Sequence, residues 1–202
     1  MFRTAGALAA ALLSAVAPAS TAQAATATAF AVTVVTANGS GCPNSTATAQ
    51  VLPDGSSFTI DFSGYFASAG GTAPPTAFRR NCQFVIQITR PEGTTYAVEN
   101  AEYSGFAVLN NGVTGLQAAS YYFQGQSASS VGSHRFTGPL ADTWDTADTF
   151  APDELVFASC LDQRLLNVNT ELRLTPQPAT AGLNAMVMDP SITLRLAWRT
   201  CP

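Results

Sequence analysis

The chain has 202 residues, of which 11% are charged, and its formal net charge is −4. The chain has no lysine, and its acidic balance disfavours binding to nucleic acid or to an anionic membrane, both of which require a basic surface. The length lies within the usual range of one domain and suffices for a substantial hydrophobic core.

The N-terminal residues have the pattern of a secretory signal peptide. Arg3 supplies a positive charge, residues 5–17 form a small-apolar run, and Ala22-Gln23-Ala24 matches a cleavage site. No later run reaches the roughly 18 apolar residues that a membrane span requires. We therefore predict a signal peptide at 1–24, followed by a single secreted domain at 25–202 that has no membrane span.

Short alternations of apolar and polar residues, separated by turn residues, follow along the mature chain, and helical periodicity is nearly absent. The segments 64–77 and 175–190 are rich in glycine or proline and predict long connections. We predict an all-β fold, a single-domain antiparallel β-sandwich of about ten strands. The expected strands are 46–52, 57–62, 83–89, 95–100, 101–109, 116–124, 133–137, 143–150, 155–159, 165–174 and 191–199.

Four cysteines in a secreted chain predict two disulfides, and their spacing matches no metal-binding template. Three pairings are possible. We favour Cys42–Cys82 with Cys160–Cys201, because each pair lies at strand ends within one half of the chain. Each bond would close a loop of about forty residues and contribute roughly 4 kcal/mol.

Several segments, taken in order, resemble a family of small secreted proteins catalogued as domain of unknown function 4360 (DUF4360), from about residue 33 to the C-terminus. The resemblance implies secretion, four cysteines and a β-rich domain, and it transfers no catalytic residue. The segments that carry it are VTANGSGCP at 35–43, RRNCQ at 79–83, SYYFQGQ at 120–126, FTGPL at 136–140, DTADTF at 145–150, LNVNTELRL at 166–174 and LAWRTC at 196–201.

The segment 165–174 suggests a binding face. One side of the expected strand is apolar, and the other carries consecutive hydrogen-bonding side chains. The alternative is a solvent-facing surface on which Glu171 pairs with Arg195 or Arg199, if the strand 191–199 is its neighbour. The candidate binding residues are Asn167, Asn169, Glu171 and Arg173, together with Tyr122 and Trp144 as the aromatic residues expected to be exposed.

Catalytic chemistry has little support in the sequence. His134 is the only histidine, Ser133 beside it would face the opposite side of a strand, and no G-x-S-x-G motif occurs, which excludes a serine hydrolase. A glycoside hydrolase needs two carboxyl groups, for which Glu171 with Asp148 or Glu102 is the candidate pair.

The densest acidic segment, with Asp142, Asp145 and Asp148, is a weak calcium candidate, because Asp145 and Asp148 would face opposite sides of a strand. We therefore predict no metal and no cofactor. Asn38 and Asn44 begin N-x-S/T sequons and are possible glycosylation sites.

The sequence favours a monomeric, non-catalytic extracellular binding or surface-associated module with a polysaccharide or protein partner. One alternative is a secreted hydrolase built around Glu171, and another is a secreted effector or inhibitor of a protein target. A pocket that joins Glu171 to a second carboxylate would favour the enzyme. An exposed aromatic strip would favour sugar binding, and an exposed apolar patch or a protruding loop, such as 64–77, would favour a protein partner.

Overall fold

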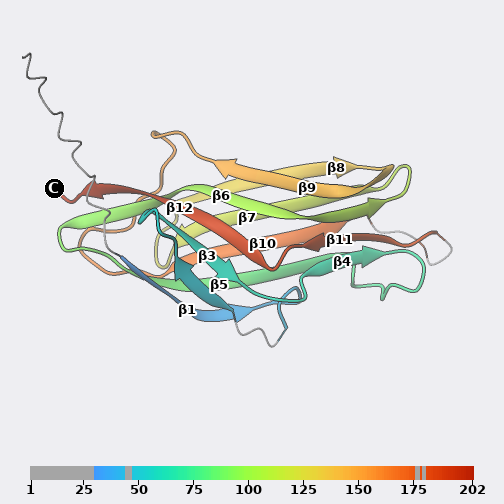
Figure 1. Cartoon of the computed structure of the whole chain (residues 1–202), viewed down its shortest axis with the longest axis horizontal. Helices are drawn as coiled ribbons and strands as arrows, with labels where there is room; N and C mark the ends of the chain where they lie inside the picture. The colour runs from blue at the N-terminus through green and yellow to red at the C-terminus, as the bar shows by residue number, and fades with distance from the viewer. Residues whose placement is uncertain (1–29, 44–46, 176–177, 179–180) are drawn as a thin grey trace, which may run out of the picture.

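A computed structural model describes residues 30–43, 47–175, 178 and 181–202. These residues form twelve β-strands in two antiparallel sheets, which confirms the predicted all-β fold (Figure 1). The predicted signal peptide and the sequon at Asn44 lie outside the described residues. Asn38 of the other sequon is the exposed last residue of a strand.

The first sheet has five strands in an order far from that of the sequence. Its central strand comes late in the chain and pairs on both sides with strands that precede it by tens of residues. In spatial order the strands are β1 (Ala31–Asn38), β5 (Arg79–Thr89), β10 (Leu166–Leu174), β7 (Thr114–Phe123) and β8 (Ser129–Thr137).

The second sheet has seven strands arranged around the long strand β6 (Thr94–Leu109). One edge of β6 pairs first with β12 and then with β11, and its other edge pairs with β9. Asp189 and Pro190 separate β11 from β12, where proline supplies no N–H to the ladder. The remaining strands are β2 (Thr48–Val51), β3 (Ser57–Asp61), β4 (Phe66–Ala69), β9 (Leu140–Thr149), β11 (Asn184–Met188) and β12 (Ser191–Thr200).

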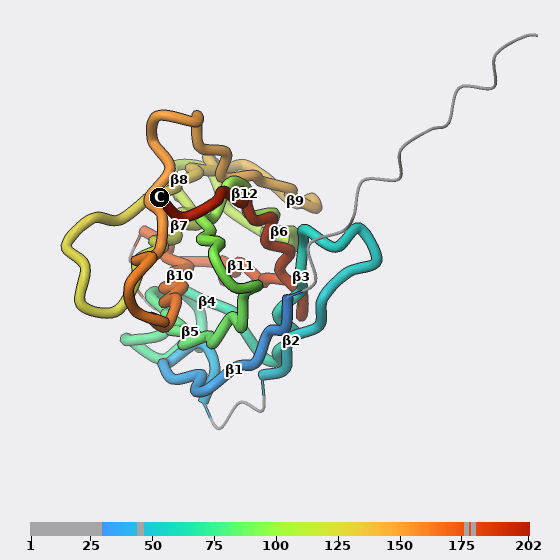
Figure 2. Tube along the Cα trace, turned by 90° about the vertical axis from the view of Figure 1, so that its left-hand side faces the viewer, coloured from blue at the N-terminus to red at the C-terminus, as the bar shows by residue number. Residues whose placement is uncertain are grey.

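The core lies between the two sheets and is built from the apolar sides of their strands. Viewed end-on, the sheets form two layers, with β1 beside β2 along one margin and β8 beside β9 along the other (Figure 2). The alternate residues of β10 are buried, and the one polar member, Thr170, donates a hydrogen bond to the Cys82 carbonyl at 3.1 Å. Ile192, Leu194 and Leu196 of β12 are buried in the same core.

Several predicted elements were wrong in detail. The structure adds β1, and it places β4 and β11 inside the two segments that were predicted to be connections. The glycines and prolines of those segments flank short strands instead of preventing them. The expected strands 95–100 and 101–109 are one continuous strand, β6. The segment 155–159 is no strand, although the Ala158 N–H donates to the Tyr96 carbonyl at 2.9 Å.

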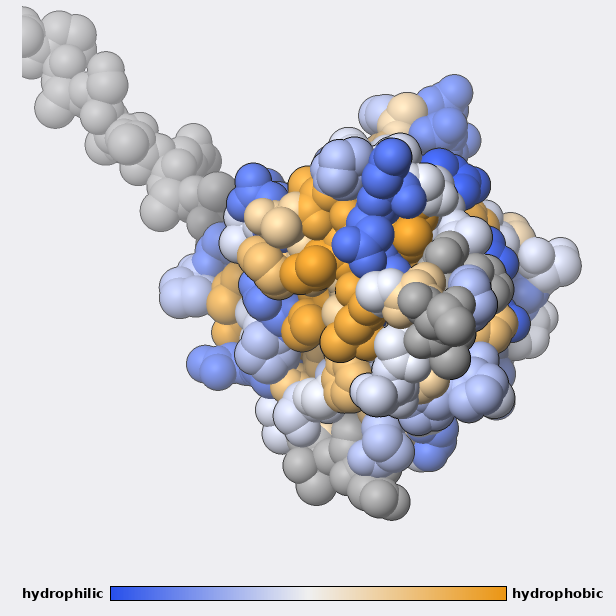
Figure 3. All heavy atoms as spheres, turned by 90° about the vertical axis from the view of Figure 1, so that its right-hand side faces the viewer, coloured by the Kyte–Doolittle hydropathy of each residue, from blue (hydrophilic) through white to orange (hydrophobic). Residues whose placement is uncertain are grey.

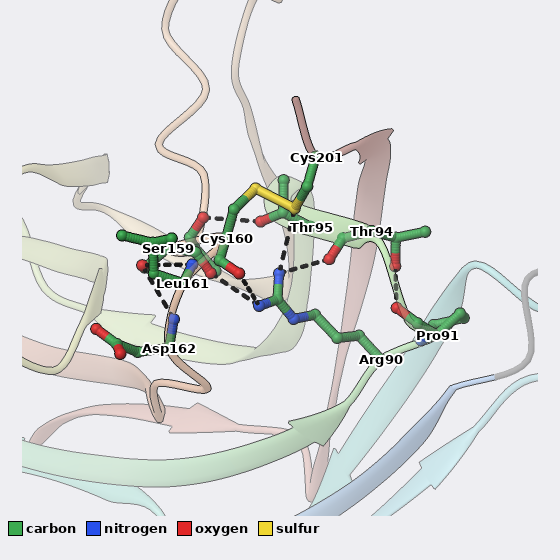
Figure 4. Close-up of a disulfide and its surroundings, with 10 residues drawn as sticks. Arg90, Pro91, Thr94, Thr95, Ser159, Cys160, Leu161, Asp162 and Cys201 are labelled. Atoms are coloured by element: carbon green, nitrogen blue, oxygen red, sulfur yellow. Dashed lines mark hydrogen bonds between the residues drawn. A yellow bond between two sulfur atoms is a disulfide. The ribbon is translucent and has the colours of Figure 1, made fainter.

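Both disulfides have the predicted pairing. The Cα atoms are 5.6 Å apart in Cys42–Cys82 and 5.8 Å apart in Cys160–Cys201. The second bond joins the segment before β10 to the end of β12 (Figure 4). Beside it, the Arg90 guanidinium donates to the carbonyls of Ser159 at 2.9 Å and Cys160 at 3.4 Å. The bond and this arginine together fix one end of the sandwich.

Candidate functional site

The polar side of β10 faces outward from the centre of the five-stranded sheet. Strand register places Glu171 between Asn81 of β5 and Ala118 of β7. One step along the strand on the same face, Asn169 lies between a glutamine of β5 and Ser120 of β7. The outer face is therefore a grid of rows that run across the strands, with small side chains on β7.

These small side chains create a groove of about 550 Å³. Ala118 and Ser120 line it from β7, Asn169 and Glu171 from β10, and Val131 from β8. Ligand pockets in proteins commonly measure about 300–1,000 Å³. The groove is thus large enough for part of an extended ligand, and hydrogen-bonding side chains of the candidate face line it.

Glu171 is held by two arginines, but not by the two that the sequence suggested. Its Oε2 atom lies 2.7 Å from Nε and 2.5 Å from Nη2 of Arg79, and its Oε1 atom lies 3.4 Å from Nε of Arg173. The predicted pairing with Arg195 or Arg199 is wrong, because β12 belongs to the other sheet. The two strands share an alternation because the apolar sides of both face the core between the sheets.

Tyr122 spans the sheet above β10. Its hydroxyl accepts a hydrogen bond from Gln83 Nε2 at 3.0 Å, and the same nitrogen donates to Asn167 Oδ1 at 3.1 Å. Because β10 lies between the strands of Tyr122 and Gln83, the tyrosine ring crosses it and covers Asn167, which is only 7% exposed. Tyr122 and Asn167 form one end of the candidate face.

The expected exposure of Trp144 is wrong, since this residue is 5% exposed. Its indole packs against Phe136, with ring centroids 5.4 Å apart, and occupies the space that a side chain at Gly105 would fill. The side of β9 that bears Trp144 therefore faces the core, and this tryptophan adds nothing to the candidate face.

The candidate carboxylate pairs for hydrolysis do not come together. Glu171 lies on the outer face of one sheet, Glu102 is exposed on a strand of the other, and Asp148 is buried between the sheets. Glu171 is the only carboxylate among the residues that line its groove. Neither of the two candidate pairs therefore supplies the facing carboxyl groups that glycoside hydrolysis needs.

The calcium candidate fails in a similar way. Asp142 and Asp145 are exposed, whereas Asp148 is buried. Among the residues that the structure describes, no group of three or more histidine, cysteine, aspartate or glutamate side chains is placed to hold a metal ion.

Sequence reasoning missed a buried network around Asp148. Its Oδ1 atom lies 2.7 Å from His134 Nε2, and its Oδ2 atom accepts a hydrogen bond from the Tyr121 hydroxyl at 2.6 Å. The Tyr103 hydroxyl lies 2.5 Å from that of Tyr121. Burial raises the pKa of both tyrosines far above its ordinary value, so they remain neutral donors.

The network joins β8 to β9, the edge strands that meet along one margin of the sandwich. Gly132 of β8 makes room for the Asp148 carboxylate, because a Cβ there would lie 1.7 Å from Oδ1. Ser133 is exposed and lies on the opposite face of β8 from His134, so these two residues do not form a nucleophile–base pair. The one available signal was a glycine inside a strand, which marks a close approach.

The seven-stranded sheet carries an exposed apolar patch on its outer side. Register places Phe66, Val187 and Phe106 side by side on β4, β11 and β6, and they are 50%, 41% and 43% exposed. Val108 and Leu183 extend this patch, and apolar side chains gather on this end of the molecule (Figure 3). Phe66 belongs to the segment 64–77, which the sequence singled out for a protein partner.

Similarity to solved structures is low. "TmCBM61 in complex with beta-1,4-galactotriose" has a TM-score of 0.34 and 10% identity, with 82% of this chain and 88% of that chain covered. The enzymatically active domain of bacteriophage CBA120 tailspike protein 4 has a TM-score of 0.28 and 11% identity, with 85% and 19% covered. A structure titled "CBM4 structure and function" has a TM-score of 0.21 and 11% identity, with 78% and 79% covered.

A relative from Arthroderma benhamiae, described as an uncharacterized secreted protein, is 33% identical over 141 residues. The match covers 70% of this chain and 58% of the relative, so the chain spans less than two thirds of the relative's length. The predicted secretion agrees with this description, and the protein is extracellular. Within the described part of the chain, no helix has the length and hydropathy to cross a membrane. The family described as "Domain of unknown function (DUF4360)" matches residues 28–201, and the chain belongs to this family.

Proposed function

We propose that this protein is a non-catalytic extracellular binding module, and that the groove on its five-stranded sheet binds a segment of polysaccharide. The observation that carries the proposal is the groove itself. Small residues on β7 form a depression of about 550 Å³ beside the polar side of β10. Three of the four β10 residues predicted from the sequence, Asn169, Glu171 and Arg173, line this depression, which supports the proposal.

The groove's chemistry suits a polyhydroxylated chain. Each sugar hydroxyl both donates and accepts hydrogen bonds, and so do the amides of Asn81 and Asn169 and the hydroxyl of Ser120, all of which line the groove. These side chains project from paired strands, which hold them in fixed positions before a ligand arrives. Tyr122 lies two residues after Ser120 on the same face of β7 and adds a ring on which a sugar can stack.

The groove favours binding over hydrolysis. Glu171 is its only carboxylate, and two arginines already occupy both oxygen atoms of that side chain. A second candidate role, recognition of an extracellular protein, is favoured by the apolar patch on the opposite sheet.

The experiment is retention of the purified protein on a panel of insoluble glycans and whole cells. Ser120→Leu fills the floor of the groove, and Thr193→Leu on β12 is the matched control on the other sheet. We expect Ser120→Leu to lose at least nine tenths of the retained protein, and the control to be retained like the wild type. Equal retention of both variants would exclude the groove, and no retention of the wild type would exclude glycan binding.

We also propose that residues 25–202 act as one domain and as a monomer. Gel filtration over a wide range of protein concentration tests whether the protein is a monomer. A dimer that forms at higher concentration and is abolished by Phe106→Ser would show that a second copy occupies the apolar patch.

A further inference from the structure

The charged residues of the strands are divided unequally between the two sheets. The five-stranded sheet contains four arginines and a single acidic residue, Glu171. The seven-stranded sheet contains six acidic residues and only two arginines. A chain whose net charge is −4 therefore has a basic sheet, and the proposed groove lies on it.

Three of the four arginines lie in one row across the outer face. Register places Arg79 opposite Arg173, Arg173 opposite Leu116, and Leu116 opposite Arg135. All three arginines are exposed. Neighbouring strands lie about 4.8 Å apart, so the row spans roughly 14 Å across the strands.

The row borders both the groove and a second depression next to it. Arg79 and Arg173 line the groove, while Arg173 and Arg135 line an adjoining depression of about 340 Å³. Leu116 lines both, so the two depressions meet at the row. A ligand that extends from one depression into the other would pass all three guanidinium groups.

Glu171 orients two of these guanidiniums and offsets only one of their two positive charges. Its side chain is 18% exposed, whereas those of Arg79 and Arg173 are 59% and 49% exposed. The carboxylate engages Nε and Nη2 of Arg79 and Nε of Arg173, so further N–H groups of both arginines point toward solvent. Within the described residues, no hydrogen bond or ion pair engages the guanidinium of Arg135.

We propose that the ligand of the groove is an acidic polysaccharide, a chain of uronic acid units whose carboxylates bind Arg79, Arg173 and Arg135. This inference rests on the proposed glycan-binding function and specifies its ligand class. The guanidinium fork matches a planar carboxylate, and the amides and hydroxyls beside it match the sugar hydroxyls. A nucleic acid is a poorer fit, because its binding depends on many phosphate contacts and this chain has no lysine.

Isothermal titration with a defined oligogalacturonate and with its methyl ester tests the ligand class. The two probes share a backbone and differ in charge. We expect the acid to bind at least tenfold more tightly than the ester, with an affinity that falls as salt is added. Arg173→Gln and Arg135→Gln should each weaken binding of the acid roughly two- to fivefold. Arg195→Gln removes one cation from the other sheet and should change the affinity less than twofold.

The outcomes separate this inference from the proposed function. Equal affinity for acid and ester, with loss of both in Ser120→Leu, would overturn the acidic ligand and keep the glycan-binding groove. Equal affinity for the acid and for duplex DNA would also overturn it, because the row would then bind any polyanion. Binding to neither probe, nor to any glycan of the panel, would overturn both proposals.

Discussion

Replacing Gly132 by alanine should destabilise the protein, although the same change in an ordinary strand is stabilising. An added Cβ would lie 1.7 Å from Oδ1, 1.8 Å from Cγ and 2.1 Å from Oδ2 of Asp148. The buried carboxylate must therefore move by more than 1 Å, roughly the difference between these distances and ordinary van der Waals contact. That shift breaks its hydrogen bonds to His134 and Tyr121, which are 2.7 Å and 2.6 Å long.

The expected loss of stability follows from these two hydrogen bonds. A hydrogen bond to a charged group contributes about 1.5–3 kcal/mol, so the two bonds together contribute about 3–6 kcal/mol. Alanine returns about 0.5–1 kcal/mol through its lower conformational entropy in the unfolded chain. The net loss should be about 2–5 kcal/mol, or a fall of roughly 4–20 °C in the melting temperature of a chain of this size.

Urea unfolding with both disulfides intact measures this loss directly. Ser133→Ala, an exposed neighbour on the same strand, is the control and should change the free energy of unfolding by less than about 0.5 kcal/mol. In an Asp148→Ala background the clash is gone, so Gly132→Ala should become neutral or slightly stabilising. An equal loss in both backgrounds would refute the argument, because the cost would then have nothing to do with the carboxylate.

Three further predictions concern the charges of the fold. Burial raises the pKa of four of the five tyrosines. The folding stability should therefore be intact below about pH 10, which is the tyrosine pKa in the unfolded chain, and should fall at higher pH. Tyrosinate absorbance should appear together with unfolding, and its appearance in the folded chain would contradict this prediction. These four tyrosines are Tyr65, Tyr96, Tyr103 and Tyr121. Hydrogen bonds from the Ser57 side chain and the Ser56 N–H lower the pKa of Asp54 to about 2. Asp54→Ala should therefore lower the urea midpoint at pH 7, and the difference from the wild type should disappear between about pH 4 and pH 2. A lower urea midpoint that persists at pH 2 would exclude the carboxylate as its cause. Glu171→Gln should reduce the melting temperature by less than about 4 °C, since exposed ion pairs contribute about 0.2–1 kcal/mol. A larger fall in a thermal melt would show that the ion pair between Glu171 and Arg79 stabilises the fold.

Local alternation predicted which side of β10 and of β12 faces the core, but not which strands are neighbours. The apolar residues that the alternation places in the core are buried, among them Leu166, Val168 and Leu172 of β10 and Ile192, Leu194 and Leu196 of β12. Their placement in opposite sheets depends on pairings between distant segments, such as β10 with β5, which no local pattern encodes. The same limit explains why the burial of Trp144 and the contact of His134 with Asp148 were not predicted. Residues of other strands surround both side chains, and the sequence of one strand does not show which strands will lie beside it.

Net charge has a similar limit as a guide to function. The acidic composition disfavoured partners that require a basic surface, but composition averages over the whole chain. Strand order then separates the charges, because β6 and β9, which carry most of the acidic strand residues, lie together in one sheet. Arg79, Arg135 and Arg173 come from three segments far apart in sequence, and only the register of four strands brings them into one row. An anionic ligand is therefore compatible with an acidic protein of this fold, provided that it approaches the five-stranded sheet.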